Sequence, residues 1–177
     1  PLASEGPLRF AFQGFRVLPQ EAGGRNWSRA RTLLAFETAP AATAPVIRWR
    51  KKPSEILQVD RDEKVFFHAG PLVSTGRIWV GLAVRGRDAR LHAACLDARS
   101  GEVLWERFLC GTTEETRRSL PSALQSFPPS GALLLRRGTL YVQTNAGFLA
   151  ALDAHTGGPL WGLLYERRRW NRLFRIE

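Results

Sequence analysis

The sequence is poor in the residue types that most directly reveal chemistry. Its 177 residues include no methionine, two cysteines and three histidines. His68, His92 and His155 do not have the short, regular spacing of zinc ligands. The histidines therefore give no support to a zinc site or to a Ser-His-Asp catalytic triad.

The two cysteines leave two alternatives. A disulfide would form in an oxidising compartment. In an antiparallel hairpin spanning residues 95–105, however, Cys95 lies opposite the region near Leu104, and Cys110 lies beyond it. This geometry favours free thiols, with Cys95 as a small core residue.

Long apolar runs are also absent. No stretch of about 18 apolar residues and no signal peptide can be seen, so nothing in the sequence predicts a membrane span. The length allows one domain or part of a larger one. Because the chain begins at Pro1 and contains no methionine, we expect it to be a fragment of a longer protein.

The sequence has fewer acidic than basic residues. Lys and Arg number 26 against 16 Asp and Glu, which gives a formal net charge of +10. A basic surface can bind nucleic acid, anionic lipid or an acidic protein. The densest sites are Arg136-Arg137 and 167–169, but no nucleic-acid-binding motif is present. The charge allows an acidic or anionic partner and gives no support to specific nucleic-acid binding.

The most informative feature that is present is an internal repeat. Residues 95–105 read Cys-Leu-Asp-Ala-Arg-Ser-Gly-Glu-Val-Leu-Trp, and residues 151–161 read Ala-Leu-Asp-Ala-His-Thr-Gly-Gly-Pro-Leu-Trp. Trp105 and Trp161 lie 56 residues apart, and one more step of that length towards the N-terminus leads to Trp49. A fixed period of this size indicates a repeat architecture.

Each copy is predicted to form a strand, a tight turn and a second strand. The Asp153 carboxylate can accept hydrogen bonds from backbone N–H groups of the turn and from the Thr156 hydroxyl. Gly157 occupies the position that is expected to need a positive φ. The corresponding residues of the earlier copy are Asp97, Ser100 and Gly101.

A tryptophan at a fixed place in each copy is most simply a packing block between adjacent sheets. Truncating a buried tryptophan to alanine costs about 3–5 kcal/mol. We expect Trp105 and Trp161 to be the most costly to remove. Trp49 should cost less, because the turn of its own copy is degenerate.

The pattern Ala-x-Asp-x-x-Thr-Gly-x-x-x-Trp resembles the tryptophan-docking motif of quinoprotein-type β-propellers. That superfamily includes the pyrroloquinoline quinone (PQQ) dehydrogenases and the outer-membrane assembly lipoprotein BamB. Cys95 and Ser100 replace the alanine and the threonine in the middle copy, and the first copy keeps only Ala39 and Trp49. The last copy matches at Ala151, Asp153, Thr156, Gly157 and Trp161.

The resemblance implies an all-β fold, a partial β-propeller of four-stranded antiparallel blades. Known propellers have about 4–8 blades, so three blades do not close a ring. In an open ring, the outer faces of the first and third blades have no neighbour. We expect Trp49, Leu160 and Leu163 to be partly exposed there. The expected division is a degenerate blade at 6–50, blades at 68–110 and 131–166, connections at 51–67 and 111–130, and the start of a missing blade at 167–177.

A PQQ dehydrogenase needs a carboxylate base near the quinone and an oxygen-lined calcium site. Its adjacent cysteine pair is missing here, and the turns account for Asp97 and Asp153. We therefore predict no catalytic, cofactor-binding or metal-binding residue in this chain, leaving PQQ and calcium to the rest of a longer protein.

The expected function is that of a non-catalytic scaffold or protein-interaction platform. Its expected place is a periplasmic, outer-membrane-associated or secreted bacterial protein, as the resemblance implies. The alternative is part of a PQQ-dependent oxidoreductase whose cofactor and calcium site lies in blades outside this segment.

Overall fold

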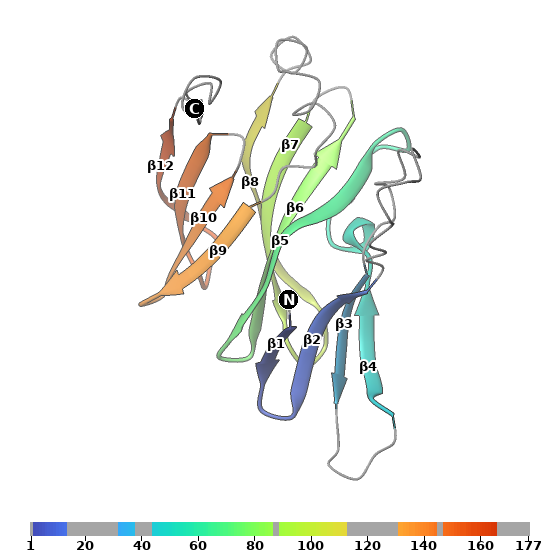
Figure 1. Ribbon diagram of the computed structural model, residues 1–177. Helices are drawn as coiled ribbons and strands as arrows, with labels where there is room; N and C mark the ends of the chain where they lie inside the picture. The colour runs from blue at the N-terminus through green and yellow to red at the C-terminus, as the bar shows by residue number, and fades with distance from the viewer. Residues whose placement is uncertain are drawn as a thin grey trace, which may run out of the picture.

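The computed structural model describes residues 2–13, 32–37, 44–86, 89–112, 131–144 and 147–165. Within these ranges the chain forms three four-stranded antiparallel sheets and one short 3-10 helix, η1 (Pro53–Glu55). The sheets stand next to one another in chain order, without closing a ring (Figure 1). The all-β class and the four-stranded antiparallel blades predicted from the sequence are confirmed.

The first sheet begins earlier than the predicted blade. It consists of β1 (Leu2–Glu5), β2 (Leu8–Gln13), β3 (Thr32–Glu37) and β4 (Val46–Lys51). The predicted start at residue 6 is wrong, because Gly6 and Pro7 form the turn between β1 and β2 instead of opening the first strand.

The second sheet is longer than predicted at both ends. It consists of β5 (Lys64–Ser74), β6 (Arg77–Arg85), β7 (Ala89–Asp97) and β8 (Val103–Thr112). The predicted connection at 51–67 therefore contains the start of a strand. Lys64 is exposed while Val65 and Phe67 are buried, so β5 already alternates where the charged composition suggested a loop.

The third sheet consists of β9 (Gly131–Arg136), β10 (Thr139–Thr144), β11 (Phe148–Asp153) and β12 (Pro159–Leu164). Several predicted segments lie outside the described residues. They are the degenerate turn near Ala39, most of the connection at 111–130, and the segment 167–177 that was assigned to a missing blade.

The core lies between the sheets, and β6 contributes to both of its halves. Val80 and Leu82 pack with Phe10 of the first sheet, whereas Trp79 packs with Leu140 of the third sheet. Successive side chains of a strand point to opposite faces, so a strand covered on both faces is apolar along most of its length. The second sheet is therefore the buried middle layer of the described structure.

His68 lies at the seam, or sheet-to-sheet contact, between the second and third sheets. A Cβ atom on Gly81 would lie 2.6 Å from His68 Nε2, and one on Gly131 would lie 2.6 Å from His68 Nδ1. Neither ring nitrogen has a hydrogen-bond partner among the described residues. Burial lowers the pKa of His68 from 6.5 to about 4. The ring is thus packed as a neutral group between two glycines.

This packing predicts a loss of stability in mild acid. The pKa of His68 is lower in the folded chain than in the unfolded chain, so the unfolded state binds more protons below pH 6.5. The free energy of unfolding should therefore fall as the pH drops from about 6.5 to about 4, by on the order of 3 kcal/mol. Denaturant unfolding at several pH values measures this slope. His68→Leu should flatten it, whereas His155→Gln on an exposed turn should leave it unchanged. An equal slope in wild type and His68→Leu would contradict this account.

Candidate protein-interaction surface

The turn between β11 and β12 is built around one carboxylate. Asp153 Oδ1 accepts hydrogen bonds from the backbone N–H groups of His155 at 2.9 Å and Thr156 at 2.7 Å, and from the Thr156 hydroxyl at 2.9 Å. The Gly157 N–H donates to the Asp153 carbonyl at 2.8 Å, and Gly157 has a φ of +71°. The bonds from Thr156, its backbone N–H first, lower the pKa of Asp153.

The turn between β7 and β8 repeats this arrangement. Asp97 Oδ1 accepts from the Arg99 N–H at 2.9 Å, the Ser100 N–H at 2.7 Å and the Ser100 hydroxyl at 3.0 Å. Gly101 has a φ of +73°. The backbone N–H of Ser100 makes the largest contribution to lowering the pKa of Asp97. We call residues 97–101 and 153–157 the docking turns, because each receives a tryptophan from the preceding sheet.

Trp49 of β4 packs on the docking turn of the second sheet. Its indole N–H donates to the Ala98 carbonyl at 3.1 Å. The ring covers Gly101 so closely that a Cβ there would lie 2.9 Å from Trp49 Cδ2. Glycine is thus required at this position both for its positive φ and for the approach of the indole.

Trp105 of β8 makes the same contacts with the docking turn of the third sheet. Its indole N–H donates to the Ala154 carbonyl at 3.3 Å, and a Cβ on Gly157 would lie 2.7 Å from the Trp105 ring. Trp79 donates to the same carbonyl at 3.0 Å, and Arg107 Nε donates to the Gly157 carbonyl at 3.0 Å. The first and second sheets are therefore each joined to the next sheet by a tryptophan of their own last strand.

This direction of docking corrects one expectation from the sequence. Trp49 was expected to be bared on an outer face, but it faces the second sheet and is half-buried. The quality of the turn in its own copy does not matter, since the turn that receives Trp49 belongs to the next copy. The tryptophan without a docking turn among the described residues is Trp161.

Strand register aligns one row of side chains across each sheet. Phe10 and Trp79, at the second position of the first two rows, are 0% and 2% exposed because the next sheet covers them. The rows are Ala3, Phe10, Ala35 and Trp49 in the first sheet, Leu72, Trp79, Cys95 and Trp105 in the second, and Leu134, Tyr141, Ala151 and Trp161 in the third.

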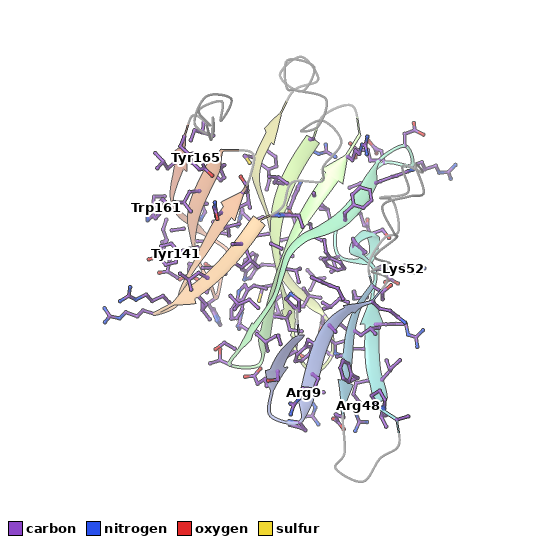
Figure 2. All side chains as sticks on the ribbon, in the orientation of Figure 1. Arg9, Arg48, Lys52, Tyr141, Trp161 and Tyr165 are labelled. Carbon is purple, nitrogen blue, oxygen red and sulfur yellow. The ribbon has the colours of Figure 1, made fainter. Side chains whose placement is uncertain are left out.

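The row of the third sheet, which we call the open row, is not covered by any other sheet of the described residues. Leu134 is 61% exposed and Trp161 is 46% exposed. The rings of Tyr141 and Trp161 lie with centroids 6.1 Å apart, on the side of the third sheet that faces away from the other two (Figure 2). Leu163, at the edge of this row, is 53% exposed. The open row is thus an apolar face of the kind that is buried at both seams.

Leu160 was also expected to be exposed on the outer face of the third blade. It is 57% exposed, but for a different reason. Its counterpart in the second sheet, Leu104, is 45% exposed although that sheet has neighbours on both faces. The exposure of Leu160 therefore comes from its place on an outer strand.

The two aspartates of the repeat do not lie together, and the described residues contain no cluster of metal-binding side chains. Among them, no group of three or more His, Cys, Asp and Glu side chains could hold a metal ion. Asp97 and Asp153 belong to different sheets, and the Oδ1 atom of each is saturated by turn donors.

The cysteines are free, as the sequence predicts. Cys95 pairs with Trp105 and Cys110 with Leu91, so they are not opposite one another in the β7–β8 ladder. Burial raises the pKa of both thiols to about 11. They are therefore protonated near neutral pH and poor nucleophiles.

No helix of the described residues has the length and apolar character needed to cross a membrane.

The tryptophan on the next sheet's turn, repeated at both seams, defines the fold as a segment of a PQQ-like β-propeller. A family model described as "Outer membrane protein assembly factor BamB" matches residues 15–173. The chain belongs to this family. A comparison with curated proteins gave no match.

Three solved structures illustrate the likeness. A europium-containing methanol dehydrogenase has a TM-score of 0.50 and 15% identity, with 92% of this chain and 24% of that chain covered. Sqt1 of Saccharomyces cerevisiae has a TM-score of 0.45 and 10% identity, covering 94% and 37%. BamB of Moraxella catarrhalis has a TM-score of 0.32 and 14% identity, covering 74% and 46%. At 24% of the dehydrogenase's length, the likeness describes the fold alone.

The docking geometry reverses the order of tryptophan contributions expected from the sequence. Trp49→Ala and Trp105→Ala each remove an indole between two sheets and should cost about 3 kcal/mol or more of unfolding free energy. Trp161→Ala removes a half-exposed indole and should cost about 1 kcal/mol. Chemical denaturation of the three variants measures the order. A loss for Trp161→Ala as large as that for Trp105→Ala would show that Trp161 is also docked.

Proposed function

We propose that the chain is a non-catalytic segment of a PQQ-like β-propeller that acts as a protein-interaction platform. Its place is a periplasmic, outer-membrane-associated or secreted bacterial protein. The observation that carries the proposal is the open row, an apolar face whose counterparts at both seams pack against a neighbouring sheet. Apolar patches of this kind mark interaction sites. The family's description as an outer membrane protein assembly factor supports the cellular setting.

The two docked tryptophans indicate what the partner must supply. Trp49 and Trp105 each receive a carbonyl acceptor and a glycine without Cβ from a tight turn. The partner of Trp161 is therefore a protein segment that carries such a turn on a sheet. A second copy of this chain does not offer one among its described residues, because Trp49 and Trp105 already occupy both docking turns. The partner is thus a different segment or a different protein.

The non-catalytic part of the proposal is supported by the same turns. The two aspartates that recur in the repeat accept hydrogen bonds from their own turns, and among the described residues no group of three or more His, Cys, Asp and Glu side chains could hold a metal ion. The competing function is that of a PQQ-dependent oxidoreductase. Dye reduction with an alcohol substrate, after addition of PQQ and Ca²⁺ to the full-length protein, separates the two. Robust turnover would contradict the platform.

Without such a partner, the open row predicts that the 177-residue chain self-associates through non-specific apolar contacts that use no docking turn. Despite the net charge of +10, it should bind a hydrophobic dye and show a sedimentation coefficient that rises with concentration. Trp161→Glu places a charge in the open row and should reduce both effects. The matched control is Leu104→Glu, which adds the same charge at an exposed position outside the row. A wild-type chain that is monomeric and binds no dye would contradict the exposed interface, as would equal effects of the two substitutions.

A further inference from the structure

A carboxylate joins the first two sheets at the turns between their first and second strands. Glu5, the last residue of β1, extends its side chain across the seam, and Glu5 Oε1 accepts a hydrogen bond from the Gly76 N–H at 2.7 Å. Gly76 lies in the turn between β5 and β6 and has a φ of +74°. The seam between the first and second sheets therefore contains an acidic side chain bound by a backbone amide.

The next seam repeats the backbone of this site without the carboxylate. Gly138 holds the place of Gly76, with a φ of +77°. The Gly138 carbonyl accepts from Ala154 N–H at 2.9 Å, as the Gly76 carbonyl does from Ala98 N–H at 2.9 Å. Ser74 ends β5 as Glu5 ends β1, and its short hydroxyl side chain cannot replace the carboxylate. An open cleft of about 530 Å³ lies here, with Ser74 and Gly138 in its lining.

The cleft carries arginines at two positions where the first seam has neutral residues. Arg77 stands where the first seam has Leu8, and Arg137 stands where it has Thr75, and both arginines line the cleft. Arg77 Nη1 donates to the His155 carbonyl at 3.1 Å. Neither arginine forms an ion pair with a carboxylate of the described residues.

One acidic residue also lines the cleft. Asp153 carries a negative charge, but its Oδ1 atom already accepts three hydrogen bonds within the docking turn. In the lining of the cleft, two guanidinium groups therefore outnumber one carboxylate, and Asp97, opposite Arg77 in the β6–β7 ladder, lies outside that lining. Guanidinium and backbone N–H groups bind carboxylates through charge-assisted hydrogen bonds, which are stronger than those between neutral groups.

We propose that this cleft binds a carboxylate group from outside the chain, in the position that Glu5 occupies at the first seam. The carboxylate accepts a hydrogen bond from the Gly138 N–H and is flanked by Arg77 and Arg137. Its source is either an acidic side chain of a bound protein segment or a free small carboxylic acid. The site lies at the seam between the second and third sheets and does not depend on the open row.

The test is an NMR titration of the chain that follows the Gly138 amide. Sodium propionate should shift this resonance in a saturable way, whereas propionamide at matched ionic strength should not. A short capped peptide rich in glutamate forms the second arm. Tighter binding of the peptide assigns the site to an acidic protein segment, and tighter binding of propionate assigns it to a free acid. The absence of saturable shifts with both carboxylates would overturn the proposal.

Two variants make the assignment specific. Ser74→Glu supplies an internal carboxylate, as Glu5 does at the first seam, and should abolish the shift while the chain stays folded. Arg137→Thr restores the residue type of the first seam and should weaken binding several-fold. Ser54→Glu, a control with the same charge change at an exposed position on η1, should bind propionate like the wild type. Unchanged binding by Ser74→Glu would overturn the proposal.

Discussion

The contact on which the rest of the structure depends is an indole ring laid over a glycine turn of the following sheet. Gly101 and Gly157 meet two demands at once, since each has a positive φ and each leaves no room for a Cβ beneath the indole. Asp97 and Asp153 hold the turns in shape, which fixes the carbonyl that accepts the indole N–H. Sheets that each bury one apolar face on a neighbour are thereby kept in chain order.

The same rule of docking explains which apolar face is left uncovered among the described residues. The first and second sheets each place a tryptophan on the next sheet, and Trp161 of the third sheet is received by no turn of the described residues. Trp161, Tyr141 and Leu134 consequently form an apolar face, whereas in the middle sheet Trp79 is a core residue and Leu72 and Trp105 pack against that core. The same kind of apolar row therefore packs the sheets together at the two seams and forms the exposed face of the third sheet.

Much of the fold could be predicted from the sequence, because the 56-residue repeat, the Asp and Gly turn and the tryptophan are all local patterns. The direction of docking could not be predicted, because no local sequence pattern indicates whether Trp49 packs on the turn of its own copy or on that of the next copy. The two glycines around His68 are far apart in the sequence, and only the sheet register brings them together. Glu5 and Ser74 can be recognised as equivalent positions only when the structure shows that Gly76 and Gly138 are equivalent. The start of β1 could not be located from the sequence, because Gly6-Pro7 and Gly70-Pro71 look alike, yet the first pair forms a turn and the second lies within β5.

The most direct measurement is a pair of double-mutant cycles on unfolding free energy. In the first, Trp105→Ala is combined with Gly157→Ala, which adds a Cβ beneath the indole on the next sheet. In the second, Trp105→Ala is combined with Gly101→Ala on the hairpin that carries Trp105 itself. The docking account predicts a coupling of about 1–3 kcal/mol in the first cycle and near-additivity in the second. Coupling with Gly101 and additivity with Gly157 would contradict the claim that each tryptophan joins its sheet to the next.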